Sequence, residues 1–163
     1  MAGFTLIEIL VVVFIIAIVA LATSLTIGNT RGGRVVKQEA NHLQRYLQLV
    51  GQTAIIDQMD LGVGIWSTGY AVWKYDYTNK KWMLITDDRA LKEYDLPEPL
   101  RITLRSEQLL GALPNTLQGV RVPQIGFSAT GSATPVTVVI SNEEIHYDVE
   151  IANNGETKIL ENE

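Results

Sequence analysis

The chain begins with an almost unbroken run of apolar residues. From Phe4 to Ile27, sixteen positions hold Phe, Leu, Ile or Val, and Glu8 is the single charged residue. As a helix these residues would reach about 36 Å, whereas the hydrocarbon core of a bilayer is about 30 Å thick. Lipid requires every backbone group to pair within the segment, so the pattern predicts a membrane-inserted helix over residues 4–27.

Glu8 opposes this insertion without preventing it. The apolar residues contribute about −8 kcal/mol on an insertion scale, and a charge costs about +3 kcal/mol at mid-membrane and less near an edge, where Glu8 lies. An ionisable residue inside such a segment is a functional candidate. We interpret Glu8 as a charge that awaits a partner during assembly. The alternative is that its side chain reaches the membrane interface and has no further role.

A second periodic pattern predicts an amphipathic helix over residues 35–57. Apolar residues recur there at spacings of three and four, which places them on one stripe that we expect to pack on a globular head: Val36, Ala40, Leu43, Leu47, Val50 and Ala54. The other faces carry polar residues: Lys37, Gln38, Glu39, Gln44, Arg45 and Gln48. Gly32-Gly33 separates the two helical patterns and indicates either a bend in one helix or a loop between two helices.

After residue 57 the pattern changes to short apolar or alternating runs bounded by turn residues, which predicts strands. The expected strands cover residues 61–66, 70–75, 81–85, 100–105, 124–128, 136–141, 145–152 and 157–160. Residues 86–99 are expected to form a polar loop, and residues 109–118 are expected to be mostly loop. The fold class is therefore α+β: a long N-terminal helix packed on an all-β, mostly antiparallel head at residues 61–160. Trp73 and Trp82, and in one interpretation Trp66, pack inside it.

Composition narrows the possible functions. The chain has 163 residues, no cysteine and a formal net charge of −5. The part outside the apolar segment is long enough for one domain with its own core. The lack of cysteine excludes a disulfide framework, a thiolate metal site and a cysteine nucleophile. A net negative charge gives no electrostatic attraction to a phosphate backbone, so we expect no nucleic-acid partner.

Candidates for chemistry are few. His42 lies on the amphipathic helix and His146 on the polar phase of a strand, and both are interpreted as surface or boundary residues. Gly62-Val63-Gly64 lacks the third glycine and the following helix of a dinucleotide loop. We therefore expect no catalytic residues and no cofactor.

Two groups of side chains allow alternative interpretations. Asp87, Asp88 and Asp95 offer carboxylates for Ca²⁺, but their spacing fits no EF-hand loop, so a solvated loop is the preferred interpretation and no metal is expected. Aromatic residues alternate in part along a predicted hairpin: Tyr70, Trp73, Tyr75 and Tyr77. They form either a binding face or a mixture of core and ordinary surface residues, and we prefer the second interpretation.

The first residues resemble a known processing motif. Gly3-Phe4-Thr5-Leu6-Ile7-Glu8 looks like the motif of type IV pilins and type II secretion pseudopilins. The resemblance implies that residues 1–3 are a leader, that a prepilin peptidase cleaves between Gly3 and Phe4, and that the new amino group of Phe4 is methylated. It also implies that Glu8 pairs with the Phe4 amine of a neighbouring subunit. Four residues are about one helical turn, so two staggered parallel helices can bring these groups together.

The C-terminal part resembles the head of the H-type minor pseudopilins, through Trp82-x-Leu84, Leu96-Pro97 and Phe127-Ser128-x-x-Gly131. This resemblance implies a type IV pilin-like fold with a periplasmic head over residues 28–163. It implies a single-pass inner-membrane protein that is incorporated into the type II secretion pseudopilus, which helps to export folded proteins across the outer membrane. The implied partners are the major and minor pseudopilins, the prepilin peptidase, the inner-membrane assembly platform and the secreted exoproteins.

Two features depart from the family pattern. The leader Met1-Ala2-Gly3 lacks the usual Lys or Arg. Arg31, Arg34 and Lys37 would place their end of the helix in the cytoplasm under the positive-inside rule, opposite to the family orientation, and we follow the family motif. The alternatives are a minor pilin of a type IV pilus, serving adhesion, motility or DNA uptake, and a membrane-anchored periplasmic enzyme or binding module.

Overall fold

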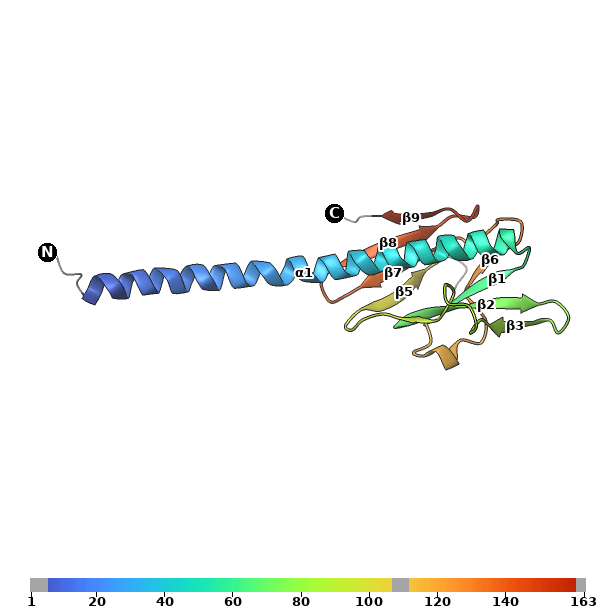
Figure 1. The fold of residues 1–163 in the computed structure, drawn as a ribbon, viewed down its shortest axis with the longest axis horizontal. Coiled ribbons are helices and arrows are strands. Elements are labelled where there is room, and N and C mark those ends of the chain that lie inside the picture. The colour runs from blue at the N-terminus through green and yellow to red at the C-terminus, as the bar shows by residue number, and fades with distance from the viewer. Residues whose placement is uncertain (1–5, 107–111, 161–163) are drawn as a thin grey trace. The chain divides into compact units, whose positions relative to one another are not determined.

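The computed structural model describes residues 6–106 and 112–160 and, within them, all side chains except those of residues 19–31. The chain divides into two compact units, Met1–Val35 and Val36–Glu163, and we describe each by itself. The elements (Figure 1) are α1 (Leu6–Ile56), β1 (Leu61–Trp66), β2 (Gly69–Asp76), β3 (Lys81–Leu84), β4 (Tyr94–Asp95), β5 (Arg101–Arg105), the 3₁₀ helix η1 (Leu117–Gly119), β6 (Ile125–Phe127), β7 (Val136–Ser141), β8 (His146–Ile151) and β9 (Thr157–Leu160).

The helix α1 supplies residues to both units. Its helical backbone continues through Gly32 and Gly33, so the alternative of a loop at this point is wrong. In the second unit, which we call the head, all six residues of the predicted apolar stripe are fully buried. The expectation that this stripe packs on the head is therefore confirmed.

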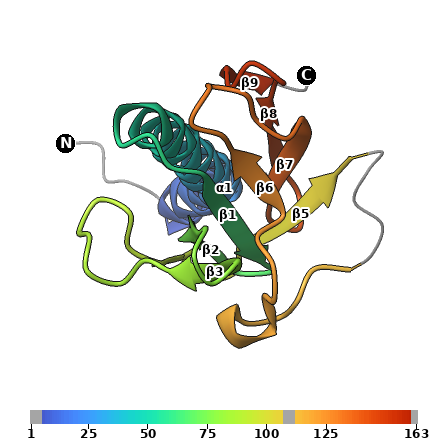
Figure 2. The same ribbon diagram turned by 90° about the vertical axis from the view of Figure 1, so that its right-hand side faces the viewer.

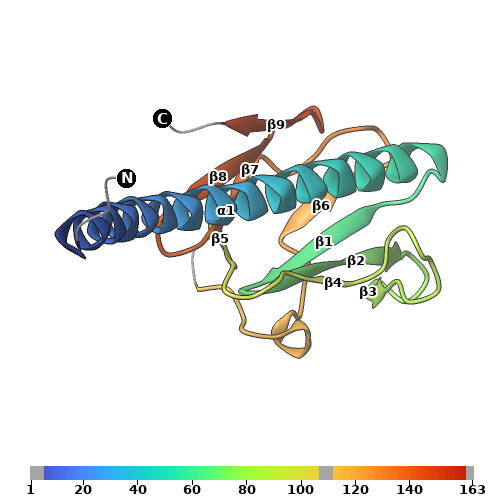
Figure 3. The ribbon, with the colours of Figure 1, turned by 60° about the vertical axis from the view of Figure 1, so that its left-hand side comes forward.

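The strands of the head form two antiparallel sheets. One has the order β3-β2-β1-β6, with β4 paired to β2 at the edge that β3 also uses. The other has the order β5-β7-β8-β9. Figures 2 and 3 show the part of α1 that belongs to the head running alongside strands of both sheets. The buried side chains of α1 and of the two sheets form one hydrophobic core. The expected α+β fold class, a long helix packed on antiparallel strands, is therefore confirmed.

Two glycines in β1 make room for large side chains. A Cβ atom on Gly64 would lie 2.3 Å from the ring of Trp73, and one on Gly62 would lie 2.5 Å from the ring of Pro123. Trp66 and Trp73 are buried, and Trp82 packs against them half-buried. The two glycines therefore allow the close packing of these rings against β1.

The structure corrects one of the two expectations for loops and, in the residues that it describes, agrees with the other. Residues 86–99 are not wholly loop, because Tyr94 and Asp95 pair with β2 as β4. Within residues 109–118, the described part contains the beginning of η1 at Leu117. Residues 107–111 lie outside the described residues.

Candidate assembly site

Glu8 lies in the first turn of α1, among exposed apolar side chains. Leu6 is 83% exposed, Ile7 70% and Phe14 62%. A negative charge in a first turn is favoured by the helix dipole. Gly3 and Phe4, the expected cleavage and methylation residues, lie outside the described residues.

The exposed apolar surface of the N-terminal unit indicates that this unit contacts other proteins or a membrane. Every described large apolar side chain from Leu6 to Ile18 is at least 47% exposed. Soluble monomers rarely expose continuous apolar patches beyond a few hundred Å², and larger ones mark contacts with proteins or membranes. Among the residues that the structure describes, no helix combines the length and the apolar character needed to cross a membrane.

In the head, four ring-bearing side chains gather between α1 and the edge of β2. His42 Nδ1 lies 2.8 Å from the hydroxyl of Tyr70, and its ring centroid lies 4.3 Å from that of Tyr94. The hydroxyl of Tyr46 donates to the backbone oxygens of Leu91 and Lys92 at 3.1 Å. His42 is half-buried, in agreement with its expected boundary position.

Glu39 corrects the sequence interpretation. It was expected on a polar face of the amphipathic helix, but it is 8% exposed and accepts a hydrogen bond from the hydroxyl of Tyr94. Burial and the neighbouring carboxylate raise the pKa of Tyr94 to about 12. Burial also raises the pKa of Tyr70 far above its usual value. These hydroxyls therefore stay protonated near neutral pH and act as hydrogen-bonding groups rather than as bases.

The structure also places the remaining candidate residues of the sequence. Asp88 Oδ1 accepts hydrogen bonds from the backbone N–H groups of Ala90 and Leu91, which shapes its loop. Within residues 6–106 and 112–160, no group of three or more His, Asp or Glu side chains is arranged to hold a metal ion. His146 is exposed on β8, as expected. Asp148 lies on the same phase of β8 as His146 but is buried, and its Oδ2 forms an ion pair of 2.8 Å with Arg105.

The aromatic residues of the β2–β3 hairpin divide between core and surface. Tyr70 and Trp73 are buried, whereas Tyr77 is 61% exposed and donates a hydrogen bond of 2.6 Å to Asp60. Tyr75 packs edge-on against Tyr77 and Trp82. This is the mixture of core and surface that we preferred over a continuous binding face.

Comparison with solved structures shows the class of fold. The minor pseudopilin EpsH of the Vibrio cholerae type II secretion system superposes with a TM-score of 0.64 at 21% identity, over 78% of this chain and 94% of that one. The type IV minor pilin FimU of Pseudomonas aeruginosa superposes with a TM-score of 0.50 at 16% identity, over 77% and 92%. The fold is therefore that of the type IV pilin-like proteins, which includes pilins and pseudopilins.

Sequence comparison narrows the class to one family. The profile described as "Type II transport protein GspH" matches residues 39–155, and the profile described as "Prokaryotic N-terminal methylation motif" matches residues 1–24. The chain belongs to the GspH family of type II transport proteins. Type II secretion system protein H of Aeromonas hydrophila is 25% identical over 173 residues, which cover 99% of this chain and 94% of that protein.

A second relative agrees with this assignment. Type II secretion system protein H of Pseudomonas aeruginosa is 26% identical over 143 residues, covering 88% of this chain and 77% of that protein. The resemblance to the H-type minor pseudopilins and the function of a type II secretion minor pseudopilin are thus confirmed. Such a protein is a structural subunit of an assembly.

Proposed function

We propose that this chain is a single-pass subunit stored in the bacterial inner membrane with its head in the periplasm. A prepilin peptidase removes residues 1–3, and the new amino group of Phe4 is methylated. The assembly platform then moves the apolar helix from the membrane into a bundle with the helices of other pseudopilins. In this role the head makes contacts with partners, the exported proteins included, and performs no catalysis.

The position of Glu8 carries this proposal. It is a single carboxylate in the first turn of α1, between exposed apolar side chains that require a cover of lipid or protein. A charge in an apolar medium is costly unless an opposite charge pairs with it. The amine of Phe4 on a neighbouring subunit supplies that charge. Phe4 and Glu8 are about one helical turn apart in each chain, so a neighbour staggered by one turn brings its amine to Glu8. The match of residues 1–24 to the methylation motif supports the same chemistry.

The mechanism that follows is a change of surroundings for one helix. In the membrane, the apolar side chains contact lipid and Glu8 lies near an interface. In the bundle, the same side chains contact neighbouring helices, and Glu8 and the Phe4 amine neutralise each other. Loss of one member of a buried ion pair leaves the other unpaired and costs about 3–5 kcal/mol. A correctly staggered neighbour is thereby selected over an incorrect one.

Mass spectrometry of the mature N-terminus tests the proposed processing. We expect loss of Met1-Ala2-Gly3 and one added methyl group on Phe4 in cells that contain the peptidase, and an unprocessed chain in cells without it. An intact N-terminus in both strains, or cleavage after Ala22 as a secretory signal peptide would show, would contradict the proposal.

A further inference from the structure

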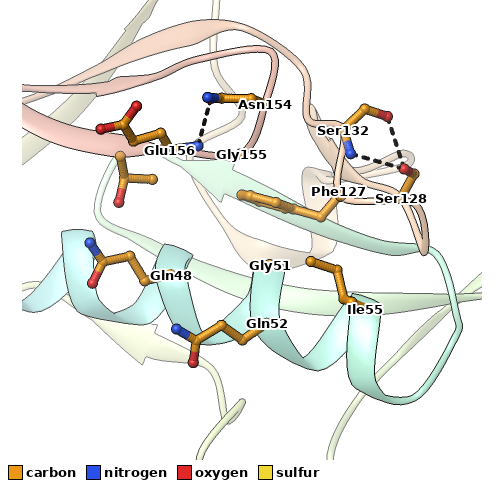
Figure 4. Close-up of a pocket in the computed structure, with 12 residues that line it drawn as sticks. Gln48, Gly51, Gln52, Ile55, Phe127, Ser128, Ser132, Asn154, Gly155 and Glu156 are labelled. Carbon is orange, nitrogen blue, oxygen red and sulfur yellow. Dashed lines mark hydrogen bonds between the residues drawn. The ribbon is translucent and has the colours of Figure 1, made fainter.

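A pocket of about 340 Å³ lies in the head between α1 and the turn from β8 to β9, and part of its lining, including Gln52 and Glu156, is exposed. Figure 4 shows Gln48 and Gln52 on the helix α1, and Glu156 on the turn from β8 to β9 at the opposite side. The ring of Phe127 lies between these two walls. The volume falls within the range of known ligand pockets, near its lower end.

Backbone geometry holds the walls of this pocket in place. Gly155 has a φ of +78°, and a Cβ atom there would lie 3.2 Å from the backbone oxygen of Gly131. A Cβ atom on Gly51 would lie 3.3 Å from the ring of Phe127. The side-chain nitrogen Nε2 of Gln44 donates to the backbone oxygen of Thr157 at 3.0 Å, which ties the start of β9 to α1. The pocket is therefore built by close contacts between α1, β6 and the segment from β8 to β9.

Thr157 is a buried residue of the pocket wall. It is 4% exposed, and its Oγ1 atom is buried without a hydrogen-bond partner among the described residues. Because this oxygen is buried, the hydrogen-bonding groups that a ligand meets come from the other lining residues.

The negative charge of Glu156 on the pocket wall favours a positively charged ligand. Glu156 is the only charged residue among the described residues that line the pocket, which disfavours anions. Its carboxylate lies 3.2 Å from Lys158 Nζ, but both side chains are more than half exposed. Such surface pairs contribute little, so an incoming cation can replace Lys158. Phe127 and Ile55 add apolar surface for an aliphatic stem.

An arginine side chain combines these properties. It has an aliphatic stem, and its guanidinium group carries five hydrogen-bond donors and no acceptor. The walls offer matching acceptors: the carboxylate of Glu156 and the amide oxygens of Gln48 and Gln52. We propose that this pocket receives an arginine side chain from a neighbouring subunit of the fibre. The choice of a subunit rests on the proposed function, in which other pseudopilins surround each head.

Titration of the full-length chain in detergent micelles tests the ligand chemistry. The probe is Nα-acetyl-L-arginine N-methylamide, and the matched control is the citrulline analogue, which has the same shape without the charge. We expect the side-chain amide NMR signals of Gln48 and Gln52 to shift with a dissociation constant in the millimolar range. The citrulline analogue is expected to bind with an affinity that is lower by about fivefold or more, because charge-assisted hydrogen bonds are stronger than neutral ones. Absent shifts, or equal affinities, would overturn the inference.

Two variants separate binding from folding. Glu156→Gln is expected to weaken binding of the arginine probe about fivefold or more. Thr157→Val is expected to bind the probe like the unchanged chain and to leave the thermal midpoint unchanged or raised, because the hydroxyl is buried and has no partner among the described residues. Glu143→Gln removes an exposed carboxylate that does not line the pocket and should bind the probe like the unchanged chain. Equal losses in Glu143→Gln and Glu156→Gln would contradict the proposed site.

Cross-linking in cells tests the source of the arginine. The chain has no cysteine, so Gln52→Cys introduces a unique thiol at the edge of the pocket. We expect it to cross-link to another pseudopilin through a short thiol-to-amine reagent, and Glu156→Lys to remove that product. Cross-linking to an exported protein alone would overturn the assignment to a subunit. Failure of probe binding with normal N-terminal processing would refute only the pocket, whereas an unprocessed N-terminus would refute the proposed function.

Discussion

The hydroxyl of Tyr94 donates a hydrogen bond of 2.8 Å to Oε2 of Glu39, and this bond joins two residues that are 55 positions apart in the sequence. Glu39 belongs to α1, whereas Tyr94 belongs to β4 at the edge of the first sheet. The ring of His42 packs on Tyr94 next to this bond. The contact fixes the segment before β5 to the helix and accounts for the burial of a carboxylate within the apolar stripe.

Tyr94→Phe should destabilise the head. The substitution leaves Oε2 of the buried Glu39 without its donor, and hydrogen bonds to charged groups contribute about 1.5–3 kcal/mol. We expect the free energy of unfolding to fall by about that amount in denaturant titrations followed by tryptophan fluorescence. Tyr77→Phe is the matched control, because Tyr77 is 61% exposed and its acceptor Asp60 also accepts the N–H of Ala129. Equal losses in the two variants would argue against the importance of burial.

Alkaline pH should destabilise the head through Tyr70 and Tyr46. Tyrosines of the unfolded chain ionise near pH 10, whereas burial raises the pKa of both residues in the folded head. The unfolded state therefore releases these protons first, so the contribution to stability is complete below about pH 10 and declines above it. Thermal midpoints measured across this range should fall above pH 10, and less steeply in Tyr70→Phe. An identical decline in that variant would contradict the role of Tyr70.

Gly64→Ala should strain the packing of the tryptophans. The added Cβ atom would lie 2.3 Å from the ring of Trp73, which is closer than real contacts allow. Overpacking of a dense core costs about 1–3 kcal/mol, so a lower thermal midpoint and altered tryptophan fluorescence are expected. Gly126→Ala is the control, since its Cβ atom would meet Thr134 Oγ1 at 3.4 Å. A variant at Gly64 as stable as the one at Gly126 would show that β1 shifts freely.

Leu47→Ala should weaken the attachment of α1 to the head. Leu47 is fully buried in the core, and removal of such a side chain costs about 2–5 kcal/mol. Ile56→Ala removes a residue that is 77% exposed at the end of the same helix, and a change within about 0.5 kcal/mol is expected. Chemical unfolding of both variants makes the comparison, and a small loss in Leu47→Ala would mean that the stripe does not anchor the helix.

Much of this fold was predictable because its signals are local. The alternation of apolar residues placed strands such as 136–141 and 157–160 at their observed bounds. The strand β4 was missed because two residues form no period. Glu39 was assigned to a polar face by its chemistry, although its spacing from Val36 and Leu43 places it within the apolar stripe. Tertiary contact with Tyr94 decided between these two signals.

The assembly motif around Glu8 and the pocket beside Phe127 also differ in how far the local sequence predicts them. The residues of the assembly motif lie within one short segment, so the sequence predicts them together. The pocket beside Phe127 combines α1 with two turns that are far apart in sequence, and no local pattern connects Gln52 with Glu156. Only the paired sheets and their contact with α1 bring those side chains together.

The proposed assembly of this chain into fibres depends on the carboxylate of Glu8. The most direct measurement is the amount of Glu8→Val chain recovered in pseudopilus fibres, together with the export of secreted protein, in cells that make normal amounts of the chain. We predict that Glu8→Val is inserted in the membrane but absent from fibres, with export lost, while Glu144→Gln in the head behaves normally. Fibre incorporation and export at normal levels in Glu8→Val would contradict the account.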